Sequence, residues 1–434
     1  MLRFAAMGWI QELYIDPAFL FPYFGFEFLP RPNALGIWVL FWLCGLSSVG
    51  ILLGLFYRWS ALLFFLSFSY IELLDKANYL NHYYFISLVA LCLIFLPAQH
   101  AFSLDLKLKR VQGYGRTPRW TILLPQVLIG GLYVMAGLAK LNSDWMLEAM
   151  PMRIWLPAHS ALPFIGDFMD KVWVAYVFSW VAALYDLSIP FFLFYHRTRL
   201  LAYASVILFH GLTAIFFPIG MFPYVMMACS LVFFSAPFLE RILTFGGRWS
   251  LVLEEVKSRT YTFSRLMKLS IAPVIVLVLV LLFLFPMRFL AYPGKLFWNE
   301  QGYRFSWRVM LMEKAGHSFF YVRDPQQKGE IEIDNSRFLT PNQEKQMNTQ
   351  ADMMLQYAHH LDSYYREQGI LDPIVRVESW VSLNGEGSRL FIDPFVDLSA
   401  LEDGWEIKSW IIPFDSVVTV QDLKALKRMK AMNP

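Results

Sequence analysis

Charged side chains and cysteines are both scarce in this chain of 434 residues. Only 16% of its residues are charged, whereas about a quarter is usual in soluble domains, and 57% are hydrophobic. The three cysteines, Cys44, Cys92 and Cys229, lie in apolar stretches, so the polar part must fold without a disulfide. The sequence has no CxxC pair, HExxH motif or glycine-rich phosphate loop and gives no support for metal or nucleotide chemistry. These deficits argue against a soluble monomer, a disordered chain and a nucleic-acid binder.

The charge that is present is unevenly distributed along the chain. Residues 1–295 hold 22 Lys and Arg against 14 Asp and Glu, a net charge of +8. Residues 296–434 hold 15 against 20, a net charge of −5, so the formal total of +3 describes neither part. We predict a polytopic α-helical membrane domain over 1–295 and a soluble extracytoplasmic domain of mixed α/β fold over 296–434.

Long apolar stretches predict how the first part crosses the membrane, since a spanning helix needs about 20 largely apolar residues. Eight stretches qualify: 34–56, 59–75, 81–98, 121–141, 172–195, 200–217, 219–237 and 272–290. The linkers on one side carry 14 Lys and Arg, and those on the other carry only Lys76, Arg153 and Lys171. The positive-inside rule makes the first side cytoplasmic, so the C-terminal domain faces a periplasm or an ER lumen.

The polar part combines predicted strands with one long predicted helix, over 344–367. The strands are expected at 318–323, 330–334, Ile374–Leu383 and 389–392. The last two flank Asn384-Gly385-Glu386-Gly387, which indicates a β-hairpin. At the other end of the chain, no signal peptide precedes the first apolar stretch, although eight spans place residue 1 outside. We therefore expect a further helix upstream of this sequence.

Ionisable residues within the apolar stretches are candidates for function, because a charge in a bilayer costs roughly 3 kcal/mol or more. They are Glu72, Asp75, His82, Lys140, Asp186 and His210. The predicted directions of the spans bring four polar residues to the outer interface: Asp75, Asn81, His82 and Lys140. His210 is expected past the middle of its span, and Asp186 deeper, towards the inside.

Each of these residues also has an ordinary structural interpretation. Lys140 can snorkel to the interface, or it can point inward, where a water-poor site favours a neutral amine that acts as a base. A lone His is more often a packing residue, Asn81 can cap a helix, and Asp186 can pair with a neighbouring polar group. The Met and aromatic residues of 219–226 are explained most simply by packing.

A series of short motifs nevertheless follows a specific order. In the membrane part the motifs are Tyr57-Arg58, Leu73-Leu74-Asp75-Lys76, Asn81-His82, Ala136-Gly137-Leu138-Ala139-Lys140-Leu141, Asp144-Trp145, Asp186-Leu187-Ser188, Phe209-His210, Ile219-Gly220-Met221-Phe222 and Tyr224-Val225-Met226. In the polar part they are Ala351-Asp352-Met353, Gln356-Tyr357-Ala358, Trp380-Val381-Ser382, Asp393-Pro394 and Val396-Asp397. Together, from about residue 57 to residue 410, they resemble the vitamin K-dependent γ-glutamyl carboxylase family.

The resemblance implies a reaction and the residues that carry it. Family members oxidise vitamin K hydroquinone (reduced menaquinone or phylloquinone) with O₂ to the epoxide, and use the energy to add CO₂ to the γ-carbon of a peptide glutamate. Lys140 matches the lysine that deprotonates the hydroquinone, and Asn81 and His82 match polar residues that hold the quinone oxygen. The residues implied to line the quinone pocket are His210, Ile219, Met221 and Met226. The implied partners are a glutamate-containing peptide or protein and membrane lipids, with no nucleic acid and no metal.

The sequence departs from the family pattern at three points. Ala139 stands where many members have a second lysine next to the one that matches Lys140. The three cysteines cannot supply the disulfide that ties the external domain of vertebrate members. The chain also ends soon after Trp410, where vertebrate enzymes continue. We interpret these departures as those of a prokaryotic relative in a cytoplasmic membrane; a eukaryotic member would lie in the ER membrane.

Two other classes of function remain as alternatives to a carboxylase. One is a quinone- or lipid-binding membrane protein that keeps the scaffold without the carboxylation. The other is a proton-coupled transporter that uses Asp186, His210 and Lys140 as a relay. The motifs of the polar part argue against a transporter, which has little need of them.

Overall fold

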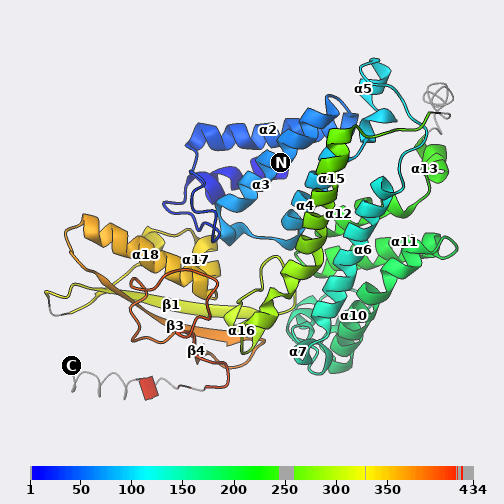
Figure 1. The fold of residues 1–434 in the computed structure, drawn as a ribbon. Helices are drawn as coiled ribbons and strands as arrows, with labels where there is room; N and C mark the ends of the chain where they lie inside the picture. The colour runs from blue at the N-terminus through cyan, green and yellow to red at the C-terminus, as the bar shows by residue number, and fades with distance from the viewer. Residues whose placement is uncertain (1, 244–258, 328, 417, 419–421, 424–434) are drawn as a thin grey trace.

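The computed structural model describes residues 2–243, 259–327, 329–416, 418 and 422–423, and Figure 1 shows a helical part beside a smaller part with strands. Within these residues, five helices are long and apolar enough to cross a membrane. They are α2 (Ala34–Leu53), α6 (Trp120–Lys140), α10 (Val172–Phe194), α11 (Arg199–Phe216) and the helix Arg265–Ala291, which joins α15 (Arg265–Leu279), η6 (Val280–Leu284) and η7 (Phe285–Ala291). Their length and composition support insertion in a membrane.

The expected count of eight spans is not confirmed. The stretch 59–75 forms α3 (Tyr57–Leu74), whose Arg58, Glu72 and three serines reduce its apolarity. The stretch 81–98 forms α4 (Asn81–Phe95), which at 15 residues is too short for a bilayer core of about 30 Å. The stretch 219–237 is broken: α12 (Phe222–Cys229) and η5 (Ser230–Phe233) meet α13 (Ala236–Leu243) at 119°. If that bent pair is one span, the described residues hold six at most.

Short helices connect these elements: α1 (Leu2–Ala6), η1 (Gln11–Ile15), η2 (Lys76–Asn78), η3 (Ala98–His100), α5 (Leu104–Lys107), α7 (Ser143–Met146), α8 (Met152–Trp155), η4 (Leu156–His159), α9 (Gly166–Met169) and α16 (Leu296–Asn299). Arg248 and Lys257, two of the basic residues expected on the inner side, lie outside the described residues.

The helices α6 and α10 pack closely because glycine forms their contact. A Cβ added at Gly137 would lie 2.7 Å from Leu187 Cγ and 2.9 Å from the Leu187 backbone nitrogen, so no larger residue fits without a shift. Small residues commonly permit such close approach between membrane helices. The contact sets the last turn of α6, which ends at Lys140, beside the part of α10 that carries Asp186.

The C-terminal part is built on a four-stranded antiparallel sheet in the order β2-β1-β3-β4. The strands are β1 (Lys314–Arg323), β2 (Ile331–Glu332), β3 (Ile374–Leu383) and β4 (Arg389–Leu390). The helices α17 (Pro341–Met347) and α18 (Ala351–Glu367) pack along one face of the sheet in Figure 1, and η8 (Asn335–Arg337) precedes them. A buried face of α18, with Met353 and Leu355 wholly enclosed, supplies its side of the core.

The predicted strands and the hairpin are confirmed, although β1 begins earlier than expected and β2 and β4 are shorter. Asn384 and Gly385 have φ angles of 51° and 77°, the left-handed conformations that such a turn requires. The single helix expected over 344–367 is instead two helices, because the chain turns at Asn348 and Gln350 is extended.

Polar contacts and a shared hydrophobic cluster hold the C-terminal domain against the membrane helices. Asn384 Nδ2 in the hairpin donates to Asp144 Oδ2 over 2.8 Å, and Lys295 Nζ lies 3.0 Å from the same oxygen. The cluster includes Ala139 and Phe216 from the helices together with Val377 from β3. The two parts therefore share one core at their junction.

Candidate active site

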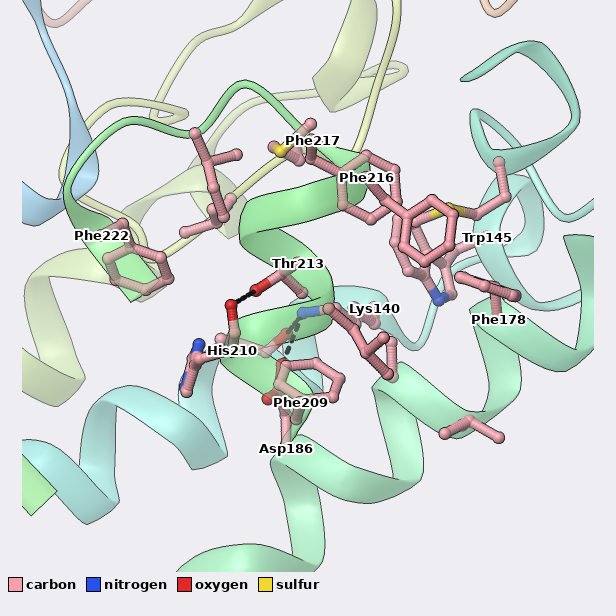
Figure 2. Close-up of a pocket in the computed structure, with 18 of the residues that line it drawn as sticks. Lys140, Trp145, Phe178, Asp186, Phe209, His210, Thr213, Phe216, Phe217 and Phe222 are labelled. Carbon is pink, nitrogen blue, oxygen red and sulfur yellow. Dashed lines mark hydrogen bonds and ion pairs between the residues drawn. The ribbon is translucent and has the colours of Figure 1, made fainter. Parts of the chain in front are cut away.

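Lys140 lies at the C-terminal end of α6, and its side chain is buried. Its Nζ is 2.7 Å from Asp186 Oδ2 on α10 and 3.4 Å from the Ala136 carbonyl oxygen, and it lies 5.6 Å from the ring centre of Trp145. Figure 2 shows the amine and the carboxylate pointing toward one another. The prediction that Asp186 pairs with a neighbouring polar group is confirmed. The expectation that Asp186 lies at another depth than Lys140 is wrong, and Lys140 does not snorkel to solvent.

An apolar cavity of about 270 Å³ opens beside this ion pair. Its wall is mostly aromatic and aliphatic, with Trp145, Phe178, Phe209, Phe216 and Phe222 among the lining residues in Figure 2. Its polar lining residues are Lys140, Asp186, Tyr133, His210 and Thr213. A cavity that is apolar over most of its surface, with a few convergent polar groups, is typical of a small-molecule site.

His210 on α11 lines this cavity and has one ring nitrogen without a hydrogen-bond partner among the described residues. A hydrogen bond of 2.7 Å joins its Nε2 to the Tyr133 hydroxyl on α6. The other nitrogen, Nδ1, is buried and has no hydrogen-bond partner among the described residues. Because a buried polar atom without a partner costs free energy, this nitrogen is a candidate contact for a ligand with a polar oxygen.

Asn81 and His82 line a second, more polar cavity of about 410 Å³ between the helices and the C-terminal domain. Asn81 does not cap α4, whose N-cap is Leu80. Instead its amide donates to the Arg308 carbonyl oxygen over 2.9 Å and accepts from the Tyr79 hydroxyl over 3.0 Å. His82 is buried against Phe222, with 6.0 Å between ring centres.

The two cavities share the wall formed by Ile219, Phe222, Val309 and Met310. Phe222 stands between the two histidines, since its ring centre is 6.0 Å from that of His82 and 6.1 Å from that of His210. Lys140 and His210 therefore lie on one side of this shared wall, and Asn81 and His82 lie on the other. The polar residues predicted from the sequence do not line a single cavity.

Two of the residues expected to line a quinone pocket do not reach the apolar cavity. His210 and Ile219 do line this cavity. Met226 is wholly buried in the hydrophobic core, and Met221 is half exposed at the start of α12. The packing interpretation describes Met226, which lies in the core.

Sequence reasoning missed the segment that forms the common wall from the C-terminal side. Phe305, Trp307 and Met310 have φ angles of 57°, 58° and 52°, a left-handed conformation that non-glycine residues seldom adopt. Such conformations cluster at functional sites. Phe, Trp and Met give no sequence signal for a left-handed conformation, so this segment could be recognised only from its backbone angles.

Two family models match the chain. The model of the HTTM domain covers residues 1–238, more than half of the sequence, and includes Lys140, Asp186 and His210. The chain belongs to the HTTM-domain family. The model of the lumenal domain of the vitamin K-dependent gamma-carboxylase matches residues 267–417, which include the sheet and two residues of the common wall, Val309 and Met310. No solved structure matches the chain.

The second match confirms the resemblance to the vitamin K-dependent carboxylase family that the ordered motifs carry. This HTTM-domain protein is accordingly a carboxylase-family membrane protein whose C-terminal domain is of the lumenal kind. The family implies vitamin K dependence and a glutamate-containing peptide or protein as substrate.

Proposed function

We propose that this protein converts peptide glutamate to γ-carboxyglutamate with CO₂ and O₂, coupled to oxidation of vitamin K hydroquinone to its epoxide. The observation that carries the proposal is the buried Lys140–Asp186 pair in the wall of an apolar cavity, one partition away from a polar cavity under the lumenal domain. We also propose a prokaryotic cytoplasmic membrane as its location, with that domain outside.

The apolar cavity fits the ring system of a quinone. Trp145, Phe216 and Phe222 provide flat apolar surfaces, and His210 Nδ1 is a buried polar atom in need of a partner. Bound there, the hydroquinone with O₂ would supply the strong base that the chain lacks, because a lysine amine matches an acid of pKa only about 10. The γ-hydrogen of glutamate is far less acidic than that.

Asp186 gives Lys140 a way to act as the weak base that begins the reaction. In a water-poor cavity, a proton can move along their 2.7 Å hydrogen bond from Nζ to the carboxylate, so that two charges become none. The neutral Lys140 Nζ would then be able to accept a proton from a hydroquinone hydroxyl bound in the cavity. Removal of the carboxylate would block the first of these two transfers.

Asn81 and His82 are proposed to act from the polar cavity, on the other side of Phe222. Both amide atoms of Asn81 are engaged with Tyr79 and the Arg308 carbonyl, so we assign it a positioning role for the wall segment. The His82 ring packs against Tyr83 and Phe222 and has no hydrogen bond with a described residue, so we assign to His82 the contact with a reacting group.

The test is carboxylation by the purified protein with reduced vitamin K, O₂, labelled bicarbonate and a glutamate peptide. We expect the wild type to fix label and the folded fraction of Lys140→Ala, which also loses one half of the buried ion pair, to fix none. Lys171→Ala, which removes an exposed lysine that pairs with Asp170, is the matched control and should be fully active. Small neutral amines should partly restore Lys140→Ala, because they can occupy the space of the missing side chain.

Two results would contradict the proposal in different ways. Normal label fixation by Lys140→Ala would remove Lys140 from the role of base. A wild-type protein that binds the quinone but fixes no label would instead favour a quinone-binding protein on the same scaffold.

A further inference from the structure

The polar cavity is locally basic although the domain above it is acidic overall. Its basic lining residues are Lys76, Arg304, Arg308, Lys314 and Lys345, and its acidic ones are Glu300 and Glu313. The lining therefore carries five positive and two negative charges, whereas residues 296–434 carry a net −5. The electrostatic potential inside this cavity is therefore expected to be positive, although the net charge of the whole domain is negative.

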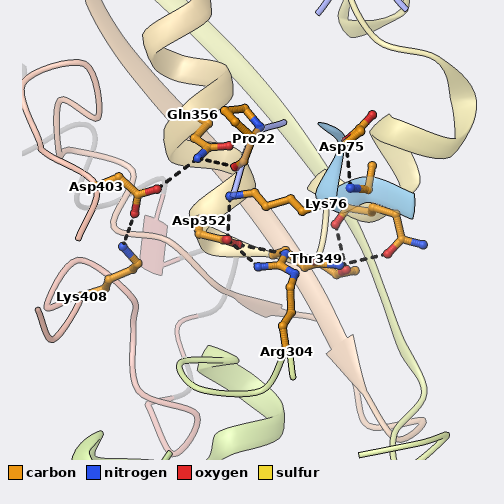
Figure 3. A network of polar contacts seen from close by, with 12 residues as sticks. Pro22, Asp75, Lys76, Arg304, Thr349, Asp352, Gln356, Asp403 and Lys408 are labelled. Atoms are coloured by element: carbon orange, nitrogen blue, oxygen red, sulfur yellow. Dashed lines mark hydrogen bonds and ion pairs between the residues drawn. The ribbon is translucent and has the colours of Figure 1, made fainter. Parts of the chain in front are cut away.

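Most of these cations are already neutralised by the protein. Lys76 Nζ and Arg304 Nη1 lie 2.8 Å and 2.6 Å from Asp352 Oδ2 on α18. Figure 3 shows both cations pointing toward this carboxylate. Lys314 Nζ lies 2.8 Å from Glu300 Oε1. Burial by itself would raise the pKa of Asp352, but Arg304 and Lys76 outweigh burial and hold that pKa well below its usual range. These groups form the joint between the domain and the helices.

Arg308 differs from them because its guanidinium is buried without a carboxylate. Its side chain is 8% exposed, and its Nε has no hydrogen-bond partner within the described ranges. Its guanidinium carbon lies 4.3 Å from the ring centre of Phe289. No ion pair of Arg308 with a described residue is found, in contrast to Arg304 four residues earlier.

A buried cation without a partner is unfavourable and is consistent with a site that an anion completes. Burial lowers the pKa of Arg308, with Tyr303 opposing the shift, which reflects this incomplete compensation. The backbone around it is nevertheless held firmly, since Asn81 Nδ2 and the Tyr303 hydroxyl both donate to the Arg308 carbonyl oxygen, over 2.9 Å and 3.4 Å. The arginine is thus fixed in place while its guanidinium lacks a counter-charge.

We propose that Arg308 binds the side-chain carboxylate of the substrate glutamate. This inference rests on the proposed function and names the residue that presents the substrate. Val309 and Met310, the next two residues, belong to the wall shared with the cavity of Lys140, so a glutamate held by Arg308 lies beside that wall. A planar guanidinium binds a carboxylate through two parallel hydrogen bonds, which fixes its orientation as well as its charge.

The chemistry of the substrate gives this contact a role beyond binding. The γ-carbon is bonded directly to the side-chain carboxylate, so breaking the Cγ–H bond sends the electron pair partly onto the carboxylate oxygens. The proton goes to the base formed at the neighbouring site, and the electron pair then forms the new bond to the carbon of CO₂. Arg308 would stabilise the second negative charge that builds up on those oxygens, where a fixed donor is most effective.

The test compares binding of two blocked peptides that differ only in a single Glu or Gln, measured with the full-length protein in nanodiscs. We expect the wild type to prefer the Glu peptide by roughly 30-fold or more, as for a buried charge pair. Arg308→Gln should abolish the preference, and Arg308→Lys should keep only part of it, since lysine offers charge without the planar fork. Arg337→Gln, an exposed arginine of the same domain, is the control and should bind like the wild type.

Quinone binding by Arg308→Gln, measured in the same nanodiscs, reports whether the variant is folded. A wild type without a Glu preference, or an Arg308→Gln variant that keeps it, would overturn the inference. If the wild type fixes no CO₂ but shows the Arg308-dependent preference, the carboxylate site stands and the proposed function fails. If Arg308→Gln carboxylates the peptide with unchanged KM and kcat, the proposed function stands and the assignment of Arg308 fails.

Discussion

Replacing Asp186 by Asn should strongly destabilise the protein, because it leaves the Lys140 ammonium buried without its counter-charge. The two side chains are only 9% and 8% exposed, so solvent screens their interaction little. Removing one partner of a buried ion pair costs about 3–5 kcal/mol. At 1.4 kcal/mol per factor of ten, the ratio of folded to unfolded protein should fall by roughly two to three and a half orders of magnitude.

The double variant Lys140→Met with Asp186→Leu separates this effect from lost packing. It removes both charges and keeps apolar volume, and such replacements are often neutral or stabilising. We therefore expect it to recover most of the stability that Asp186→Asn loses, although both variants should be inactive as carboxylases. The difference is an interaction free energy that a double-mutant cycle with the two single variants measures.

The assay is reversible unfolding in lipid bicelles, followed by tryptophan fluorescence. A loss of less than about 1 kcal/mol for Asp186→Asn, with no recovery in the double variant, would refute the reasoning. In that case the two groups would not depend on each other for burial, and the proton transfer proposed between them would lose its basis.

Two further predictions concern the packing around the site and the joint between the domains. Gly137→Ala should cost about 1–3 kcal/mol in the same unfolding assay, because its Cβ would lie 2.7 Å from Leu187, whereas Gly130→Ala, with 3.4 Å to its nearest neighbour, should be tolerated. Asp352→Asn should cost about 3–5 kcal/mol and expose the joint to limited proteolysis, since it leaves the buried Lys76 and the partly buried Arg304 without their shared counter-charge. Because the pKa of Asp352 is held low in the folded protein, its stabilising effect should be complete above about pH 4 and be lost as the pH falls further, so wild-type proteolysis should not change between pH 5 and 8.

The sequence was sufficient for the local elements of the C-terminal domain and insufficient for the number of membrane spans. Alternating residues and an Asn-Gly turn define β3, β4 and their hairpin locally, and the structure agrees. Hydropathy alone does not show that α4 has only 15 residues. Nor does it show that the stretch 219–237 forms two helical segments that meet at 119°. Those properties depend on where the chain turns, which tertiary packing decides.

The candidate site shows the same division between local and distant information. The motifs pointed to Lys140 and Asp186 individually, but a depth estimated from span direction separated them by mistake. Their pairing depends on the close approach of α6 and α10 at Gly137. Lys140 and Asp186 are 46 residues apart in the sequence, so no local pattern predicts the contact. Arg308 could not be selected from the sequence at all, because what marks it is the absence of a partner within the described residues.

The most direct measurement of the central claim is the mass of a glutamate peptide after incubation with the purified protein, reduced vitamin K, O₂ and bicarbonate. We predict that the peptide gains the mass of one CO₂ per modified glutamate, only when the reduced quinone and O₂ are both present, and that Lys140→Ala leaves the peptide unchanged. If the peptide keeps its mass after incubation with the wild-type protein, while the quinone is shown to be bound, the account is contradicted.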